Sequence, residues 1–359
     1  MSANWLLYGA NGYTGKLIAQ EAQRRGMSPV LAGRGAAVAA LAQELRLPHR
    51  LFDLEDVAAV RAGLAGIDLL LHCAGPFSAT SAPMLEACLD ARAHYLDITG
   101  EIDVFAHCHA QDARAKQRGI VVLPGAGFDV VPTDCLAAQL AREMPDAISL
   151  VLAFEAGGGP SPGTAKTSVE GLGNGGRARI DGKLERVPLA WKTRTFERAS
   201  TGPAQAGEAG IERRSAMTIP WGDVYTAFVS TGIPNIEVYM AVSPKTIANV
   251  RRLRLLGPLL RTRLLQNFLK HRVEKSVRGP SDAKRGSTVT HLWGEVRDAA
   301  GRELRAQLLT PNGYALTVTA SLGIVQRLLR GNAPTGYRTP SQLMGADYVL
   351  SLPGVRRVI

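Results

Sequence analysis

Short apolar runs alternate with amphipathic stretches through the first third of the chain. Apolar runs of four to seven residues bounded by turn residues are typical of buried strands, and the stretches between them are typical of helices. The predicted strands cover residues 5–8, 29–33, 49–52, 67–73, 94–97 and 120–123. The predicted helices begin after residue 15 and then cover 36–45, 54–62, 81–90 and 104–117. Strands alternating with helices in this way predict an α/β fold with a Rossmann-type, doubly wound parallel sheet over residues 1–130.

The pattern changes after residue 130. Pro132 opens a predicted helix to residue 142, and alternating apolar and polar positions then predict strands at 149–154, 236–242, 287–296, 305–309 and 315–320. Glycine-rich stretches at 157–163 and 171–176 are predicted loops that could fold over a substrate. Residues 131–332 are therefore expected to form a second, α+β domain on a mixed, mostly antiparallel sheet.

A glycine-rich turn joins the first predicted strand to the first predicted helix. It reads Gly9-Ala10-Asn11-Gly12-Tyr13-Thr14-Gly15, a GxxGxxG spacing instead of the commoner GxGxxG. In such a turn the first glycine permits the bend, the second admits a pyrophosphate close to backbone N–H groups, and the third lets the helix pack on the strand. Glycine-rich turns also occur as purely structural devices. The expected cofactor contacts are Gly9, Asn11, Gly12, Tyr13, Thr14 and Gly15.

A phosphate loop of the nucleoside-triphosphatase type is the competing interpretation, because Gly15-Lys16 resembles the end of one. That motif requires a glycine five residues before Gly15, where Ala10 stands, and Ser or Thr after Lys16, where Leu17 stands. The turn therefore favours a dinucleotide.

Three further loops lie at the carboxyl ends of predicted strands, where a doubly wound sheet binds its cofactor. Arg34 follows the second strand and is suited to the 2′-phosphate of NADP, whereas an acidic residue there would favour NAD. An exposed surface arginine is the alternative. Asp53 follows the third strand and could accept a hydrogen bond from the adenine amino group. The loop after the fourth strand contributes Cys73, Ala74, Gly75 and Pro76.

Composition agrees with two ordinary globular domains. Of 359 residues, 46% are apolar and 20% charged, and no apolar run approaches the roughly 18 residues of a membrane span. The N-terminal residues lack the basic lead of a signal peptide, and the four cysteines are scattered with no CxxC pair. We therefore expect a reduced, cytoplasmic protein.

The net charge of +11 is concentrated in residues 245–285. This segment holds twelve Lys or Arg residues and two acidic ones, so it carries ten of the eleven net charges. Such local basicity, without a nucleic-acid-binding motif, argues against a nucleic-acid partner. Val250, Leu253, Leu256, Leu260, Leu264 and Phe268 can share one face of a helix interrupted at Gly257-Pro258. This face could contact an anionic membrane or an acidic, carrier-bound acyl substrate, or simply cover the second sheet.

The chain resembles the saccharopine dehydrogenase-like oxidoreductases. The motifs that carry the resemblance are residues 9–15, Leu31-Ala32-Gly33-Arg34, Cys73-Ala74-Gly75-Pro76-Phe77, residues 95–101, residues 127–134, Ser230-Thr231-Gly232-Ile233-Pro234-Asn235 and Gly336-Tyr337-Arg338-Thr339-Pro340. The resemblance implies that about 333–359 return to complete the first domain and that the chain could form a homodimer. The family includes enoyl reductases that act in trans on lipid-type thioesters. No arrangement suited to the carboxylates of saccharopine is recognisable.

Catalytic candidates lie at the carboxyl ends of the fifth and sixth strands. Reduction of a C=C or C=N bond needs a hydride from the cofactor and a proton from an acid. Tyr95 could donate this proton, and Glu101 or Asp129 could position the substrate. Alternatively, Asp97 and Asp129 cap helices and Tyr95 belongs to the core. None of the eight tyrosines has Lys four residues later, so the short-chain dehydrogenase mechanism is excluded.

We therefore expect an NADP(H)-dependent oxidoreductase acting on a small-molecule or acyl-thioester substrate. The alternative is a protein that binds NADP(H) without turnover, as a redox sensor or scaffold. No metal site is expected, because His107, Cys108 and His109 have no zinc-type spacing.

Overall fold

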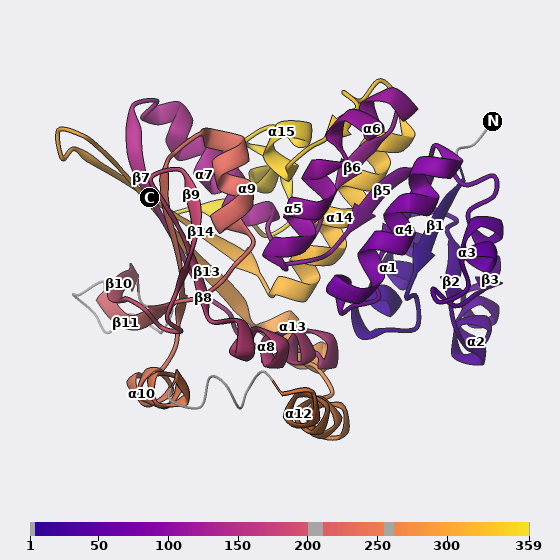
Figure 1. The fold of residues 1–359 in the computed structure, drawn as a ribbon, viewed down its shortest axis with the longest axis horizontal. Coiled ribbons are helices and arrows are strands. Elements are labelled where there is room, and N and C mark those ends of the chain that lie inside the picture. The colour runs from indigo at the N-terminus through magenta and orange to yellow at the C-terminus, as the bar shows by residue number, and fades with distance from the viewer. Residues whose placement is uncertain (1–3, 200–210, 255–261, 359) are drawn as a thin grey trace.

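The computed structural model describes residues 4–199, 211–254 and 262–358, which form two sheets with helices around them (Figure 1). The first sheet has seven strands, all paired in parallel, in the order β15-β6-β5-β4-β1-β2-β3. This order confirms the predicted Rossmann-type sheet. Its strands are β1 (Trp5–Tyr8), β2 (Val30–Gly33), β3 (His49–Leu51), β4 (Leu69–His72), β5 (His94–Asp97), β6 (Val121–Leu123) and β15 (Gly336–Tyr337).

Helices cover both faces of this sheet because successive strand residues point to opposite sides. Leu7 packs on one side and Leu6 on the other, and both are fully buried. One face is covered by α1 (Tyr13–Arg24), α2 (Ala36–Leu45) and α14 (Gly313–Leu329). The other is covered by α3 (Val57–Gly63), α4 (Phe77–Ala91), α5 (Ile102–Ala110) and α6 (Asp112–Arg118). The predicted helix at 104–117 is therefore two helices, which meet at Gln111.

The second sheet is mixed and has nine strands, in the order β10-β11-β12-β7-β13-β14-β16, with β8 and β9 joined at β12. Only the β12–β7 pairing among them is parallel. This confirms the expected second domain. Its strands are β7 (Ala147–Glu155), β8 (Gly176–Ile180), β9 (Lys183–Val187), β10 (Thr193–Ala199), β11 (Ile211–Thr218), β12 (Asn235–Ala241), β13 (Val289–Asp298), β14 (Glu303–Pro311) and β16 (Arg356–Arg357).

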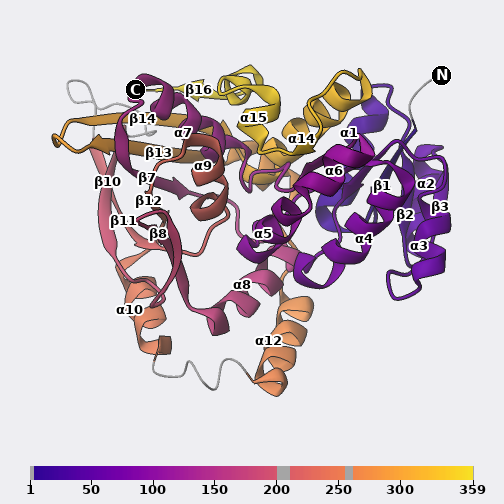
Figure 2. The same ribbon diagram turned by 45° about the horizontal axis from the view of Figure 1, so that its top comes forward.

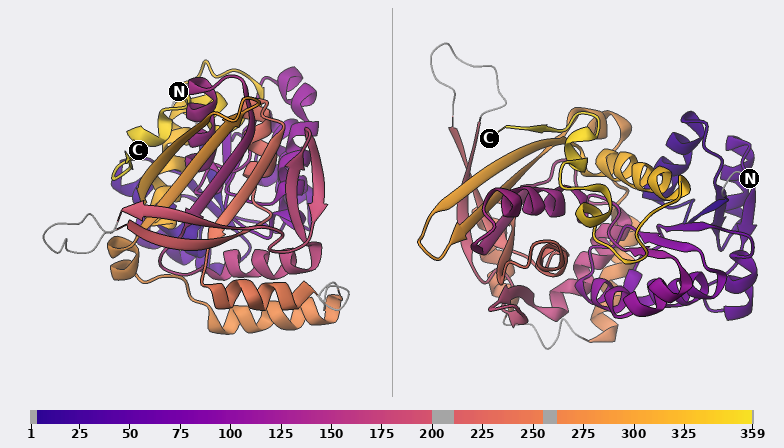
Figure 3. Two further views of the ribbon diagram at one scale, coloured as in Figure 1. Left: turned by 90° about the vertical axis from the view of Figure 1, so that its left-hand side faces the viewer. Right: turned by 90° about the horizontal axis from the view of Figure 1, so that it is seen from above.

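Helices of the second domain lie on one face of this sheet and around its lower end (Figures 1 and 2). Buried side chains of α7 (Val131–Glu143) and α9 (Asp223–Thr231) share a core with the sheet, and α14 joins that core to the first domain. Seen from above, α14 lies between the two sheets (Figure 3). The remaining helices are α8 (Pro162–Asn174), α10 (Pro244–Leu253), α12 (Arg263–Ser276), α13 (Asp282–Ser287) and α15 (Pro340–Met344), with a 3-10 turn η2 (Tyr348–Ser351).

The predicted strand at 315–320 is wrong, because these residues belong to α14. Asn312 caps this helix by accepting a hydrogen bond from the Tyr314 N–H at 3.0 Å. The helix lies between the two cores, and its polar residues Thr317 and Ser321 are buried too. The Thr317 hydroxyl donates to the Gly313 carbonyl at 2.9 Å, which satisfies it inside the helix. Burial on all sides removes the amphipathic period that normally reveals a helix in sequence.

Two other predictions change. Residues 171–174 are the last turn of α8 and not a loop. The C-terminal segment serves both domains, since β15 pairs with β6 of the first sheet whereas β16 pairs with β14 of the second. The predicted interrupted basic helix corresponds to α10 and α12, and Leu256, Leu260 and Gly257-Pro258 lie outside the described residues.

Candidate functional site

The glycine turn lies at the carboxyl edge of the first sheet, between β1 and α1. Gly9 has a φ of +79°, and a Cβ there would lie 2.8 Å from the Ala74 nitrogen. A Cβ on Gly15 would lie 2.2 Å from the Gly9 carbonyl oxygen. A side chain therefore fits at neither position, as expected for a turn in which helix, strand and the neighbouring loop approach closely.

The N-terminus of α1 is free of its own capping groups. Gly12 is the N-cap residue and makes no side-chain cap, and no acidic residue lies in the first turn. By contrast, α3 is capped by Asp56, whose carboxylate accepts from the Ala59 N–H at 3.0 Å. Unpaired N–H groups at the positive end of a helix form an anion site. The turn therefore fits a dinucleotide pyrophosphate.

Arg34 and Asp53 follow adjacent strands beside this turn. Arg34 is exposed, and Asp53 is half-buried. Burial and, to a smaller extent, the nearby Asp53 charge raise the pKa of Tyr8 to about 12, while Arg34 lowers it. The Tyr8 hydroxyl donates to the Phe52 carbonyl at 3.1 Å. A cation and a carboxylate thus lie near one end of the glycine turn, where the adenosine ribose of a dinucleotide would be recognised.

The loop after β4 packs directly on the glycine turn. Ala74 contacts Gly9, and the Ala74 carbonyl accepts a hydrogen bond from the Thr80 hydroxyl at 2.7 Å. The Glu101 carboxylate accepts from the Phe77 N–H at 2.8 Å and the Ser78 N–H at 2.7 Å, at the start of α4. Glu101 thereby holds the loop of residues 73–76 in place, and its predicted part in catalysis stays a prediction.

Tyr95 and Asp97 form a buried pair. The Tyr95 hydroxyl donates to Asp97 Oδ2 at 2.7 Å, and Asp97 Oδ1 accepts from the Thr99 and Gly125 N–H groups at 3.0 and 2.9 Å. Burial raises the pKa of Asp97 to about 6, although these three donors lower it. The pair joins the loop after β5 to the loop after β6. Tyr95 thus belongs to the core, which was the alternative to a catalytic role. Its hydroxyl proton is bound to Asp97 and is not available to a substrate.

Asp129 differs from the other acidic candidates. Its carboxylate lies against Gly100, where a Cβ would be 2.7 Å from Asp129 Oδ2. Among the described residues, none donates a hydrogen bond to this carboxylate. Burial raises the pKa of Asp129 to about 7, which is suited to giving or taking a proton near neutral pH. The side chain is half-buried and so keeps some access to solvent.

The second domain reaches the glycine turn through Tyr13. The Tyr13 hydroxyl donates to the Pro280 carbonyl at 2.7 Å and accepts from Arg285 at 3.3 Å. The Tyr13 ring packs edge-to-face on Tyr314, with centroids 4.9 Å apart. The Tyr314 hydroxyl contacts the N-terminal turn of α8 through the Ser161 N–H. The glycine turn therefore faces a surface of the second domain formed by α13, α14 and the N-terminus of α8.

Sequence reasoning did not identify Arg285, Tyr314 or Thr317 as neighbours of the site. The Phe128 N–H donates to the Thr317 hydroxyl at 2.9 Å, so α14 also supports the loop that carries Asp129. No local motif marks these residues, because they meet the glycine turn only when the two domains pack together.

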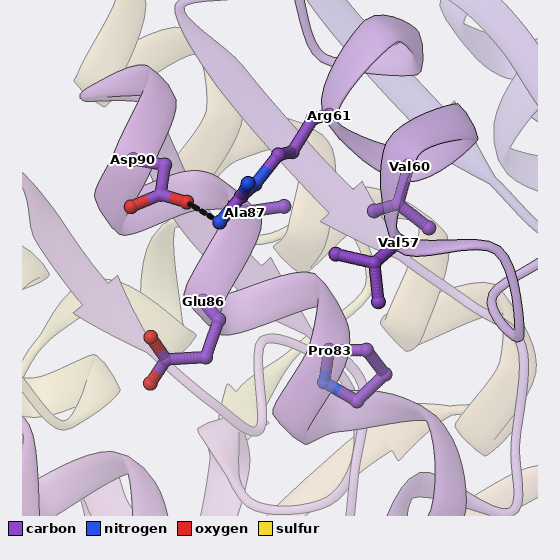
Figure 4. Close-up of a pocket in the computed structure, with 7 residues that line it drawn as sticks. All are labelled: Val57, Val60, Arg61, Pro83, Glu86, Ala87 and Asp90. Carbon is purple, nitrogen blue, oxygen red and sulfur yellow. Dashed lines mark ion pairs between the residues drawn. The ribbon is translucent and has the colours of Figure 1, made fainter.

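A separate pocket of about 330 Å³ lies between α3 and α4 (Figure 4). Its charged side chains already have partners: Arg61 pairs with Asp90 at 3.0 Å, and Glu86 accepts from Arg114 at 2.7 Å. It lies on the outer helical face and not at the carboxyl edge of the sheet. Within the described ranges, no group of three or more His, Cys, Asp or Glu side chains is arranged to hold a metal ion.

Comparison with known proteins matches residues 5–123 to the family described as the saccharopine dehydrogenase NADP-binding domain. A saccharopine dehydrogenase-like oxidoreductase of Mus musculus is 24% identical over 201 residues, which cover 48% of this chain and 47% of the relative. A trans-acting enoyl reductase of Mycobacterium bovis is 30% identical over 152 residues, covering 38% and 35%. The chain thus spans about half or less of the length of these curated relatives. The resemblance seen in the sequence motifs is confirmed.

A solved structure shares the whole architecture. Saccharopine dehydrogenase (L-Glu forming) from Saccharomyces cerevisiae superposes with a TM-score of 0.66, covering 99% of this chain and 100% of that one, at 12% identity. At this identity the similarity establishes the fold alone.

Proposed function

We propose, from the match of residues 5–123 to the saccharopine dehydrogenase NADP-binding domain family, that the chain is an NADP(H)-dependent oxidoreductase. The observation that carries the proposal is the uncapped N-terminus of α1 at the glycine turn, with exposed Arg34 after the adjacent strand. This combination fits a pyrophosphate and a 2′-phosphate together. A bound nicotinamide supplies or accepts the hydride.

The substrate side of the site is formed where the two domains meet. We propose that it takes a small-molecule or acyl-thioester substrate with a C=C or C=N bond, and the similarity to a trans-acting enoyl reductase supports this choice. We propose that Asp129 gives or takes the proton, because burial raises the pKa of its carboxyl to about 7 and no described residue donates a hydrogen bond to it. Asp97 holds the loop after β6 through the Gly125 N–H, and Glu101 holds the loop after β4 through the Phe77 N–H.

The first experiment is a fluorescence titration of the purified chain with NADPH and with NADH. We expect NADPH to bind more tightly and Arg34→Ala to remove most of the difference, since a charge-assisted contact to the 2′-phosphate contributes about 1.5–3 kcal/mol, or roughly 10- to 150-fold. Arg118→Ala is the matched control, because Arg118 is an exposed arginine at the end of α6 in the same domain. Equal affinity for both nucleotides, unchanged in Arg34→Ala, would refute the NADP preference.

Turnover separates an enzyme from a binding protein. Enoyl thioesters and imines are added to the chain with NADPH, and oxidation of the nucleotide is followed by absorbance. Tight NADPH binding without turnover of any of these substrates would favour the redox sensor or scaffold. Failure to bind either nucleotide at millimolar concentration would refute both the oxidoreductase and the NADP(H)-binding sensor or scaffold.

A further inference from the structure

Within the described residues, helix α12 is attached to the protein through one side. Leu265, Gln266 and Leu269 are half-buried, and Gln266 Nε2 donates to the Val169 carbonyl of α8 at 3.0 Å. These positions lie within about 100° of one another around the helix, at the spacing expected of a single packed face. The opposite side of α12 is therefore directed away from the second domain.

That opposite side carries two large apolar side chains. Leu264 is 87% exposed and Phe268 is 57% exposed, and they are one helical turn apart. Single exposed apolar residues are ordinary on a protein surface. Two adjacent ones on the outward side of a helix, one of them almost fully exposed, form a small apolar projection.

Two cationic side chains of the same helix lie beside this projection. Arg272 and Lys275 are exposed on the same side of α12, one to two turns further along. Arg252 on α10 and Lys284 on α13 are also exposed. Figures 1 and 2 place α10 and α12 at the same end of the second domain, outside its sheet. The apolar projection thus has two exposed cations, Arg272 and Lys275, next to it on α12.

We propose that this α12 face, defined by Leu264, Phe268, Arg272 and Lys275, binds the surface of an anionic lipid bilayer. Apolar side chains enter the boundary between headgroups and acyl chains while neighbouring Lys and Arg pair with anionic headgroups. Among the described residues no helix is long and apolar enough to cross a bilayer. Attachment occurs in the plane of the interface.

The geometry favours a bilayer over an acidic protein partner. A stable protein interface needs about 800 Å² on each side with a packed apolar centre. Two projecting side chains with two cations beside them supply no such centre, whereas a soft headgroup layer accepts them without a preformed pocket. Charge complementarity with anionic lipid is provided by Arg272 and Lys275, which are exposed on the same side of α12.

The test is co-sedimentation of the whole chain with lipid vesicles. One set contains phosphatidylcholine alone and the other about a third phosphatidylserine, each at about 50 mM and about 300 mM salt. We expect binding to the anionic vesicles at low salt and its loss at high salt. The double variant Leu264→Glu/Phe268→Glu should bind at least about tenfold more weakly, because it replaces both inserting groups by anions.

Val57→Glu is the matched control. Val57 is 59% exposed, close to the value for Phe268, but it lies on α3 in the first domain. This control should bind vesicles like the unaltered chain, and thermal unfolding should show that both variants are folded. No binding to anionic vesicles at low salt, or equal binding by the double variant, would overturn the proposal. Binding to an acidic acyl carrier protein instead, lost in the double variant, would assign the face to a protein partner.

Discussion

Replacing Asp129 by Asn should stabilise the protein in a pH-dependent way. Burial raises the pKa of this carboxyl from 3.8 to about 7, and no described residue donates a hydrogen bond to it. The native state therefore holds a proton that the unfolded state releases between about pH 4 and pH 7. Within this window the folded state binds more protons, so the stability contributed by Asp129 falls as pH rises.

The size of the effect follows from the shift. About three pKa units at 1.36 kcal/mol each give an upper limit of about 4 kcal/mol above pH 7. Partial exposure of the carboxyl reduces the effect, so we expect about 1–3 kcal/mol. Asn is neutral and of similar shape, and it removes this cost. The variant should match the unaltered protein near pH 4 and exceed it in stability at pH 8.

Urea unfolding followed by circular dichroism at pH 5 and pH 8 measures the difference. Burial also raises the pKa values of Asp97 and Asp223, which are present in both proteins. The difference in stability between the variant and the unaltered protein therefore reports on Asp129. Asp129 itself raises the pKa of Asp223, so its removal should act in the same direction there. A stability difference that is equal at the two pH values, or an Asn variant that is less stable at pH 8, would refute the reasoning.

The same variant tests the proposed chemistry. If Asp129 moves the proton, turnover should fall by about 10²–10⁴-fold in Asp129→Asn while NADPH binding is retained. Because the variant is expected to be more stable at pH 8, such a loss could not be attributed to unfolding. Turnover that is unchanged would exclude Asp129 as the proton donor.

Two other substitutions test the loops that build the site. Gly15→Ala should lose nucleotide binding and stability, because its Cβ would lie 2.2 Å from the Gly9 oxygen; Gly171→Ala, in open space inside α8, should be neutral or stabilising by up to about 1 kcal/mol. Equal melting temperatures for Gly15→Ala and the unaltered chain would contradict this account. Glu101→Gln should destabilise the protein by about 1–3 kcal/mol, measured by urea unfolding. The Phe77 and Ser78 N–H groups donate to different oxygens of Glu101, and Gln keeps only one acceptor oxygen and loses the negative charge at the start of α4. Unchanged stability would show that this carboxylate does not hold the loop.

The sequence by itself determined the first domain of the protein. Buried strands such as residues 5–8 and the turn from Gly9 to Gly15 are specified by neighbouring residues, because chain bending and close helix packing have local steric requirements. The position of Arg34 directly after the second strand could also be predicted, because the strand at residues 29–33 is recognisable from its own apolar residues. Local patterns also predicted most strands of the second sheet, where apolar and polar positions alternate.

Only the tertiary structure decided which residues surround the site and what the acidic residues do. Apolar and polar side chains alternate at residues 315–320 as in a strand, yet these residues belong to α14, which packs between the two cores. Tyr13 meets Arg285, 272 residues away, and Tyr314 only after the domains pack. Asp97 ends β5 and Asp129 lies in the loop after β6; they are the same residue type, but Asp97 receives three hydrogen bonds and Asp129 receives none from the described residues. These differences arise from burial and long-range contacts, which local sequence does not encode.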